Sequence, residues 1–523
     1  MQIQGGSPKG VLSSREKSTL KREDQLHQQR VLYQRVFLLR SLQGWWYRIA
    51  LAILAGIIAG FLGRFALISP LAVIGGIIML PLCVLFVRRL EVGLLFTAIF
   101  ATPFLPKAFS LKSLDIYPAA VTVLLLFIAV LLRTVFRAPR SIWPSFWVIW
   151  PQFGLIVLAV ISDIMIQVTW IPEVPRQINN NPVILNDMLG IVIYLFPLMT
   201  IVVTTVALTK RSQWIEYIQI TLVILSMIAS FVIMIDFVRL GANLYTFRFI
   251  EQNVGWMSLR SLAQLYCLGA IIAYGRFLYA SHLHKRLFYI GAVVLCLVSV
   301  GITLQNSWWS EVGVALVVMT IVYSPRLFLS ICAIALPFVP LLSGQVTKLL
   351  SVKSDDYYRF IIWGDFLRVW SKRPWLGVGP GNAWGYDQVY TMLPPLIRDF
   401  NKTGLGVAHN GYIQTLTELG PIGLFFLIAS IIVIAVAATR LYRRSNTQET
   451  CTDRVLGLIA LGLICGSVVG DYTSGSLFLP ARQVGMVNEI PSVLTSWILF
   501  GCVLYKDQLW RLTRKRLSIE ESL

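Results

Sequence analysis

The sequence predicts an all-α polytopic membrane protein with about 12–14 transmembrane helices and one long external loop. Of its 523 residues, 56% are hydrophobic and only 13% are charged, and the mean hydropathy is +0.71. So few charges do not cover the surface of a soluble protein of this size, which favours a membrane environment. Apolar segments recur along the chain, and residues 344–419 form the one long polar interruption.

Apolar segments that meet the length of a transmembrane helix, roughly 20 residues or fewer where protein shields an end, define the predicted helices. They start near residues 45, 67, 91, 116, 144, 183, 213, 260, 286, 308, 326, 420, 455 and 491. Those near 91, 308 and 491 are short, and each is compatible with a re-entrant segment. The predicted organisation is a basic tail (1–44), eleven helices (45–343), the loop (344–419), three helices (420–505) and a second basic tail (506–523).

The net charge of +20 indicates membrane orientation and not nucleic-acid binding, because the basic residues lie in short clusters between apolar segments. With a cytoplasmic N-terminus, the inner connections carry 29 of the 45 Lys and Arg residues, and eight of the other 16 lie in the long loop. Long loops are largely exempt from the positive-inside rule. We therefore expect both termini inside and residues 344–419 outside.

The N-terminal tail has apolar residues at helical spacing among arginines over Leu26–Leu42. This pattern suits a helix lying on an anionic membrane surface, and it equally suits a solvated tail that only fixes orientation.

Only four histidines are present, and the expected topology leaves His409 as the one histidine outside. His282 and His284 form a His-x-His pair beside Lys285, without carboxylate or cysteine neighbours, which is more typical of a basic interfacial turn than of a metal site. The seven cysteines lie mostly in apolar segments without paired spacing, which is typical of core residues and not of disulfides or metal ligands.

Within the loop, Asp355–Lys372 has helical spacing, with Ile362 and Phe366 on one broad apolar face and Arg359 near the outer membrane surface. The next stretch, Pro374–Asn382, is rich in glycine. It lacks the preceding strand and the following Lys-Ser/Thr of a nucleotide-binding loop. We expect a tight turn that approaches a neighbouring backbone or a ligand closely.

His409 is expected to begin a helix that continues into the membrane segment after Gly420. The dipole at a helix N-terminus disfavours the imidazolium, so a neutral imidazole that accepts a proton is expected near pH 7. On position alone, a capping or packing histidine is the alternative. Glu418 points to the opposite side of an ideal helix, so the two residues are not expected to form a dyad.

Three groups of residues stand out together. They are Arg359-x-x-x-Trp363, then Arg373-Pro374-Trp375-Leu376-Gly377-Val378-Gly379-x-Gly381, then His409-Asn410-x-Tyr412-x-Gln414-x-x-x-Glu418-Leu419-Gly420-x-Ile422-Gly423. In this order and spacing they resemble the signature of the O-antigen ligase and Wzy-type polymerase superfamily, closely over about residues 300–425 and elsewhere through hydropathy and topology.

The resemblance implies a GT-C-like glycosyltransferase in a bacterial inner membrane, acting at the periplasmic face without metal or nucleotide-sugar cofactor. The implied partners are a polyprenyl-diphosphate-linked glycan donor and a glycan or lipid acceptor. The resemblance implies that His409 activates the acceptor hydroxyl and that Arg359 contacts the donor diphosphate. Such a reaction needs a base for the attacking hydroxyl and fixed positive charge for the departing diphosphate, and an arginine fork binds two phosphate oxygens. The other motif residues are implied to be structural: Trp363, Gly377, Gly379, Gly381, Asn410, Gln414, Glu418 and Gly420.

One part of the signature is missing. The family usually has a Ser-Arg-Gly-like stretch at the outer end of the helix that begins here near residue 308, and Leu304–Glu311 contains no arginine. Either another external arginine substitutes, with Arg248 and Arg260 as candidates, or the donor differs, or transfer activity is lost. Glu311 needs a partner or a polar cavity because an isolated charge in an apolar segment is costly, and Arg260 is one conceivable partner.

Two other functions stay open from the sequence. The first is a transporter for inorganic carbon, another small anion or a lipid-linked sugar, although no internal repeat and no matching pair of Gly/Pro-broken helices indicates one. The second is a catalytically inactive family member that serves as a membrane assembly partner.

Overall fold

A computed structural model describes residues 84–86, 88–102, 104, 109–111, 114–136, 143–168, 177–178, 181–209, 211–241, 253–254, 257–303, 306–338, 355–383, 386, 408–444, 448–473 and 490–520. The chain divides into two units by its internal contacts: residues 1–82 with 129–140, and residues 83–128 with 141–523. All predicted site residues belong to the second unit. The tail 1–44 and the predicted helices near residues 45 and 67 lie outside the described residues.

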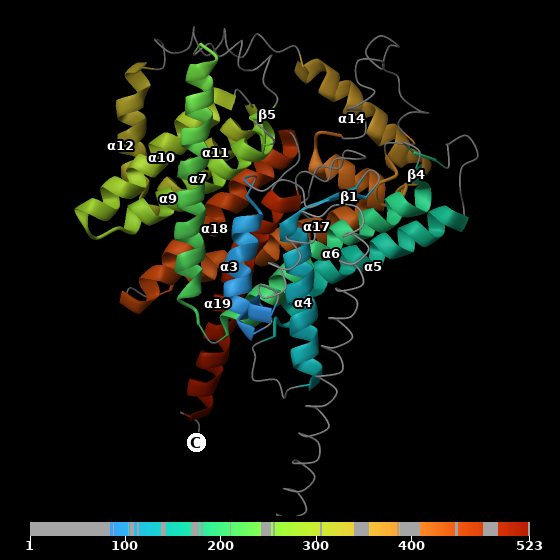
Figure 1. Ribbon diagram of the computed structural model, residues 1–523, viewed down its shortest axis with the longest axis horizontal. Helices are drawn as coiled ribbons and strands as arrows, with labels where there is room; N and C mark the ends of the chain where they lie inside the picture. The colour runs from blue at the N-terminus through green and yellow to red at the C-terminus, as the bar shows by residue number, and fades with distance from the viewer. Residues whose placement is uncertain are drawn as a thin grey trace, which may run out of the picture. The chain divides into compact units, whose positions relative to one another are not determined.

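Helices dominate the described part of the chain (Figure 1). They are α3 (Leu90–Phe100), α4 (Pro118–Phe136), α5 (Phe146–Val168), α6 (Val183–Leu208), α7 (Trp214–Arg239), α9 (Leu259–Tyr279), α10 (Leu283–Thr303), α11 (Asn306–Tyr323), α12 (Pro325–Ala335) with the 3-10 turn η1 (Leu336–Phe338), α14 (Asp355–Lys372), α17 (Gly411–Tyr442), α18 (Gln448–Thr473) and α19 (Ile490–Glu520). Every predicted start from residue 91 to residue 326 lies within three residues of an observed helix start.

Three short antiparallel hairpins each lead directly into a helix. They are β1 (Phe109–Leu111) with β2 (Leu114–Ile116) before α4, β3 (Gln177–Ile178) with β4 (Asn181–Pro182) before α6, and β5 (Asn253–Val254) with β6 (Met257–Ser258) before α9. Because each strand has only two or three residues, the hairpins close connections and leave the all-α architecture unchanged.

Seven of the described helices are long and apolar enough to cross a membrane, which confirms the predicted polytopic α-helical class. The spans are Phe146–Val168, Gly190–Leu208, Trp214–Arg239, Leu262–Tyr279, Leu283–Thr303, Gly411–Tyr442 and Cys451–Gly470. Four shorter apolar helices accompany them, namely Leu90–Phe100, Pro118–Thr134, Ser307–Tyr323 and Pro325–Ala335.

One helix boundary near the C-terminus differs from the sequence prediction. The transmembrane segment expected from about residue 420 is the second part of α17, which begins at Gly411, two residues after the start expected at His409, and breaks at Gly420. The last helix is not short, because α19 has 31 residues from Ile490 to Glu520. The predicted tail from Lys506 therefore continues this helix to Glu520, since residues 506–520 contain no proline or glycine that would end it.

Small residues allow the central helices to pack closely. Gly462, Gly466 and Gly470 recur every four residues on α18 and therefore share one face of the helix. Cβ atoms placed on these three glycines would lie 2.5–2.7 Å from atoms of α11, among them the carbonyl oxygen of Glu311. This small-xxx-small pattern is typical of helix pairs in membranes, where close backbone approach replaces the hydrophobic effect.

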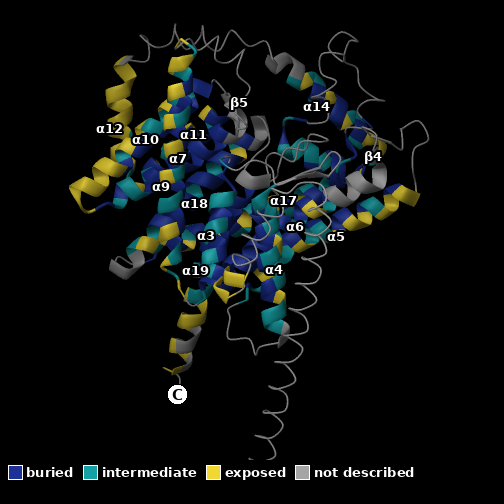
Figure 2. Ribbon diagram, viewed as in Figure 1, coloured by how far each residue is buried: buried dark blue, intermediate teal, exposed yellow. Residues whose placement is uncertain are grey.

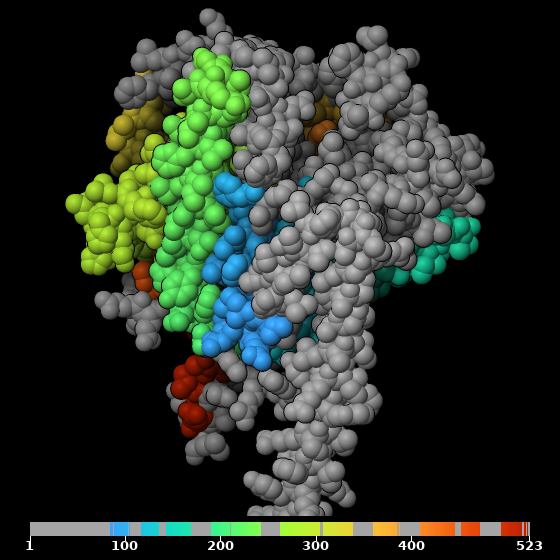
Figure 3. Space-filling model, in the orientation of Figure 1, coloured from blue at the N-terminus to red at the C-terminus, as the bar shows by residue number. Residues whose placement is uncertain are grey.

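Burial follows this arrangement. Buried residues concentrate on α6, α9, α18 and the first half of α19, whereas α12 has none (Figure 2). On one face of the molecule α7 lies beside α3 (Figure 3), and its outward side chains, such as Phe231, Ile235 and Val238, are 55–69% exposed. Exposed apolar side chains along a helix of membrane length suit contact with lipid.

Replacing Gly466 by alanine is expected to destabilise the protein, because the new Cβ would lie 2.6 Å from the carbonyl oxygen of Glu311. Overpacking of this kind costs about 1–3 kcal/mol, so heating purified protein in detergent should abolish its monodisperse chromatographic peak at a lower temperature. Gly313→Ala is the matched control, since no atom lies within 4 Å of a Cβ at Gly313 on α11. Equal behaviour of the two variants would contradict the close α11–α18 packing.

Candidate active site

The site is built on α14, the helix inside the long polar region. Its apolar residues at three- and four-residue spacing, Ile362, Phe366 and Val369, are at most 5% exposed, so the predicted apolar face is confirmed. They form one cluster with Val378, Ala383, Tyr386, Ala408 and Ile166 of α5. This packing fixes α14 against residues 378–386 and against Ala408. In Figure 1, α14 lies along the upper edge above α17.

A glycine-rich turn follows α14. Gly377, Gly379 and Gly381 have φ values of 67°, 87° and 82°, in the left-handed region that only glycine enters without strain. A Cβ on Gly377 would lie 2.3 Å from the carbonyl carbon of Glu418. The sequence prediction of a tight turn in close approach to a neighbouring backbone is therefore confirmed, and that neighbour is α17.

The turn supplies hydrogen-bond donors to a break in α17. Pro421 has no N–H, so the carbonyl of Thr417 lacks its usual donor four residues on. The N–H of Val378 donates to this carbonyl at 2.9 Å, and the N–H of Gly379 donates to the carbonyl of Glu418 at 3.0 Å. Gly420 sits at the break with φ 68° and ψ −172°. The glycine-rich turn thus replaces the hydrogen bonds that the broken helix does not make for itself.

A third element joins this junction from α5. The Ser162 hydroxyl donates to the Leu376 carbonyl at 2.7 Å and lies 3.5 Å from the Glu418 carbonyl oxygen. Ser162 is 1% exposed. The sequence analysis missed this residue, because a single serine in an apolar helix more often bonds to its own helix backbone.

His409 lies just before α17, and not in its first turn as predicted. The N-cap is Asn410, whose side chain accepts from the N–H groups of Tyr412 and Ile413, both at 3.0 Å. His409 is half-buried with φ 49°, the one non-glycine residue with positive φ among those described. A bulky residue in this conformation is held there by its surroundings and is typical of functional sites.

The residue before His409 is fixed through both of its backbone groups. The Trp363 indole N–H donates to the Ala408 carbonyl at 2.8 Å, and the Ala408 N–H donates to Gln414 Oε1 at 3.0 Å. Gln414 Nε2 in turn donates to Glu418 Oε1 at 2.5 Å. Glu418 is 1% exposed, so these contacts link the backbone at Ala408 to a buried carboxylate.

Arg359 reaches this site through its helix. It lies four residues before Trp363 on α14, so the two side chains lie on one face, one turn apart. Arg359 is half-buried. Since Trp363 contacts the residue next to His409, the structure brings the first and third sequence groups together, with the glycine-rich turn bracing the helix behind them.

Several other helix ends meet at this end of the bundle. The Tyr412 hydroxyl donates to the Val468 carbonyl near the end of α18 at 3.1 Å. The Cys267 thiol of α9 contacts the Trp308 carbonyl at 3.4 Å. The Ser467 hydroxyl near the end of α18 also donates to Glu311 near the start of α11, so the starts of α9, α11 and α17 and the end of α18 are on the same side.

Glu311 has a polar partner, as the sequence predicts, but the observed partner is Ser467 and not Arg260. Its Oε1 accepts from the Ser467 hydroxyl of α18 at 3.3 Å, and the residue is 1% exposed. Arg260 is in the first turn of α9, but its side chain lies outside the described part of the structure. Arg248 is also outside it, so neither predicted second arginine is assigned a contact.

The fold and site together define a polytopic α-helical membrane protein with a polar junction at one end of its helices. Residues 277–428 match the family model described as O-antigen ligase, a segment that runs from the end of α9 past the break in α17. This match confirms the family resemblance seen in the three residue groups, over that segment of the chain. No curated protein matches the chain.

Replacing Trp363 by phenylalanine should loosen the backbone before His409, since it removes the indole donor and keeps an aromatic ring. A hydrogen bond contributes about 1 kcal/mol, so amide exchange in peptides covering residues 405–412 should accelerate about fivefold by mass spectrometry. Trp370→Phe is the matched control, because its indole donates to the Pro374 carbonyl in the turn just after α14 and not to the segment before His409. Unchanged exchange in the Trp363 variant would exclude the anchoring role.

Alanine at Gly377 should disrupt the junction. The new Cβ would meet the α17 backbone at 2.3–2.6 Å and would force a residue with a Cβ into φ 67°, a strain of about 1–3 kcal/mol before the clash is counted. We expect loss of thermal stability in detergent. Gly364→Ala on α14 has nothing within 4 Å of its Cβ and should retain stability. A tolerated Gly377→Ala would show that the turn does not brace α17.

Proposed function

We propose that this protein transfers a polyprenyl-diphosphate-linked glycan to a hydroxyl acceptor at the periplasmic face of a bacterial inner membrane. The observation that carries the proposal is the anchoring of the backbone on both sides of His409, by Trp363 and Gln414 before it and by the Asn410 cap after it. A histidine that only packed or capped would not need three separate contacts to fix its position.

In the proposed reaction His409 is the general base. An imidazole nitrogen takes the proton of the acceptor hydroxyl as its oxygen attacks the anomeric carbon of the donor sugar. The new glycosidic C–O bond forms while the bond from the anomeric carbon to the diphosphate oxygen breaks. The polyprenyl diphosphate leaves with the bonding electron pair, and the proton on His409 passes to solvent. A positioned base of this kind typically contributes about 10²–10⁴-fold to the rate.

Arg359 stabilises the departing diphosphate in this proposal. It lies on α14 one turn before Trp363, whose indole contacts the segment that carries His409. A planar fork that binds two phosphate oxygens suits this role better than a lysine. The charge that develops on the leaving group then meets a fixed positive charge without reorganisation.

Arg260 is our candidate for the arginine missing near residue 308. The start of α9 lies at the same end of the bundle as the start of α11, as the Cys267–Trp308 contact indicates. An arginine in the first turn of α9 is therefore positioned to serve the same end of the molecule. Arg248 is the second candidate and precedes the β5–β6 hairpin that leads into α9.

The proposed periplasmic position of His409 rests on the distribution of basic residues along α17. The end of α17 remote from His409 carries Arg440, Arg443 and Arg444, and α19 brings Lys506 to them. Under the positive-inside rule, such a cluster favours the cytoplasm, which supports a periplasmic position for His409 and its neighbours.

His409→Ala is expected to abolish surface-polysaccharide ligation or elongation in cells that lack the native gene, with accumulation of the lipid-linked glycan. His284→Ala is the matched control, since this histidine is exposed and stacks on His282 at 5.5 Å, and it should restore normal glycan. Arg359→Ala should lose activity, and Arg359→Lys should recover only part of it. The His409→Ala and Arg359→Ala proteins should each elute from size-exclusion chromatography as folded protein.

Normal glycan from the His409 variant would refute the proposal. Solute uptake by purified protein in liposomes, without glycan turnover, would instead establish the transporter alternative. Absence of any glycan phenotype on gene deletion would favour an inactive assembly partner.

A further inference from the structure

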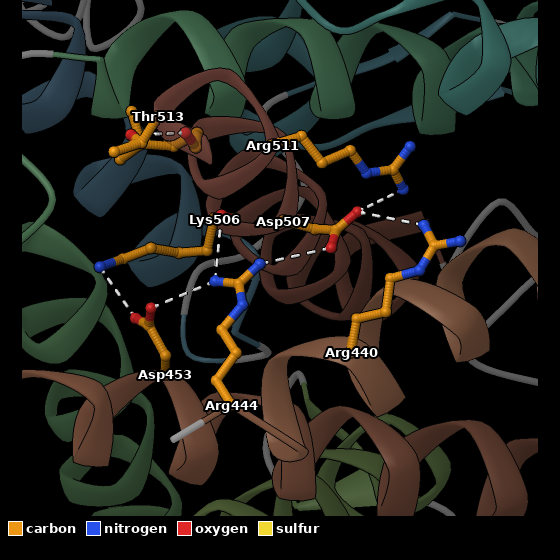
Figure 4. Close-up of polar contacts among 8 residues, drawn as sticks. Arg440, Arg444, Asp453, Lys506, Asp507, Arg511 and Thr513 are labelled. Atoms are coloured by element: carbon orange, nitrogen blue, oxygen red, sulfur yellow. Dashed lines mark hydrogen bonds and ion pairs between the residues drawn. The ribbon is translucent and has the colours of Figure 1, made fainter. Parts of the chain in front are cut away.

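A second polar cluster lies at the other end of α17, where α18 begins and α19 leaves the apolar core. Arg444 is at its centre and is 8% exposed. Its Nη2 is 3.3 Å from Asp507 Oδ1, and its Nη1 is 3.4 Å from Asp453 Oδ2. Lys506 Nζ lies 2.9 Å from the other Asp453 oxygen, so the two carboxylates join three helices (Figure 4).

An open-sided pocket of about 950 Å³ adjoins this cluster. Its polar side is lined by Arg440, Arg443, Arg444, Asp453 and Lys506, and its apolar side by Ile432, Ala435, Val436, Leu509 and Trp510. On α17 the apolar residues precede Arg440 by four to eight residues, whereas Leu509 and Trp510 follow Lys506 on α19. Along α17 the pocket therefore changes from apolar to positively charged.

Positive charge in the pocket exceeds what the two carboxylates neutralise. Arg443 is exposed and has no ion pair among the described residues, and Arg440 is about half exposed with one contact of 3.7 Å to Asp507. Arg444 keeps a buried Nε without a hydrogen-bond partner. Burial lowers the pKa of the Arg444 guanidinium despite Asp453 and Asp507, so another anion nearby would stabilise its charge.

The apolar side suits an acyl chain. Ile432 and Val436 are 55% and 41% exposed on a helix that crosses the membrane, and the described residues leave them uncovered. Trp510, in the apolar lining, contacts the polar side directly, since the Arg444 guanidinium lies 4.7 Å from its ring centroid. Tryptophan between charged and apolar surfaces is typical of the lipid headgroup level.

We propose that this pocket binds an anionic phospholipid, with its phosphate against Arg440, Arg443 and the Nε side of Arg444 and an acyl chain along Ile432 and Val436. Basic pockets between transmembrane helices are suited to such headgroups. A soluble phosphate compound would use only the polar side. The site is separate from the proposed transfer site, which lies at the opposite end of α17.

Native mass spectrometry of the full-length protein from detergent, supplied with phosphatidylglycerol or phosphatidylcholine, tests the proposal. We expect retained phosphatidylglycerol and little phosphatidylcholine. Arg443→Gln and Arg440→Gln should each weaken phosphatidylglycerol binding about fivefold. Arg326→Gln is the matched control, because it removes an exposed positive charge on α12 outside the pocket and should leave binding unchanged.

Two further measurements distinguish a lipid phosphate from a soluble phosphate as the bound anion. Inorganic phosphate at millimolar concentration should neither compete with phosphatidylglycerol nor raise the melting temperature; competition would mean a soluble-anion site and would overturn the lipid assignment. Equal binding of the two lipids, or equal loss in all three variants, would also overturn it. The Arg443 variant should keep its glycan-transfer activity in short assays at saturating donor, so a failed transfer hypothesis and a failed lipid site give different results.

Discussion

The break in α17 is the constraint on which the candidate site depends. Pro421 removes one helical donor and Gly420 takes a conformation that no helix contains, so carbonyl groups are left open inside a packed, low-dielectric region. The backbone N–H groups of Val378 and Gly379 close them. Because those donors come from the turn after α14, the same bonds that repair the helix also fix α14, and with it Arg359 and Trp363, against the segment that carries His409.

This arrangement places chemistry and orientation on one continuous helix. The broken end of α17 carries the cap, the buried Gln414–Glu418 contact and the positive-φ histidine, and its other end carries the arginines that contact Asp453 and Asp507. A helix of this length spans a bilayer. The two ends of α17 therefore differ. The end near His409 has a fixed backbone geometry, and the end near Arg444 has excess positive charge beside exposed apolar side chains.

Much of this was predictable from sequence, and the physical reason is periodicity. Helix starts from residue 91 to residue 326, the apolar face of α14 and the glycine turn follow from patterns within one segment. The donors to the break in α17, the Ser162 contact and the bond from Trp363 to Ala408 join residues 39 or more positions apart, and no local pattern encodes such pairs. Gly420-Pro421 reads as a boundary, and the donors from the turn after α14 allow the helix expected from His409 to continue through it as α17. The expected positions of Arg248 and the N-terminal tail lie outside the described residues and stay predictions.

The central claim is that Arg359 and His409 serve one donor at one site. A cryo-electron microscopy structure of the protein in lipid nanodiscs, with a polyprenyl-diphosphate-linked glycan bound, tests it most directly. We predict that the diphosphate contacts the Arg359 guanidinium and that the anomeric carbon faces His409 across a space large enough for an acceptor hydroxyl. A diphosphate bound away from α14, or a donor sugar remote from His409, would contradict the account.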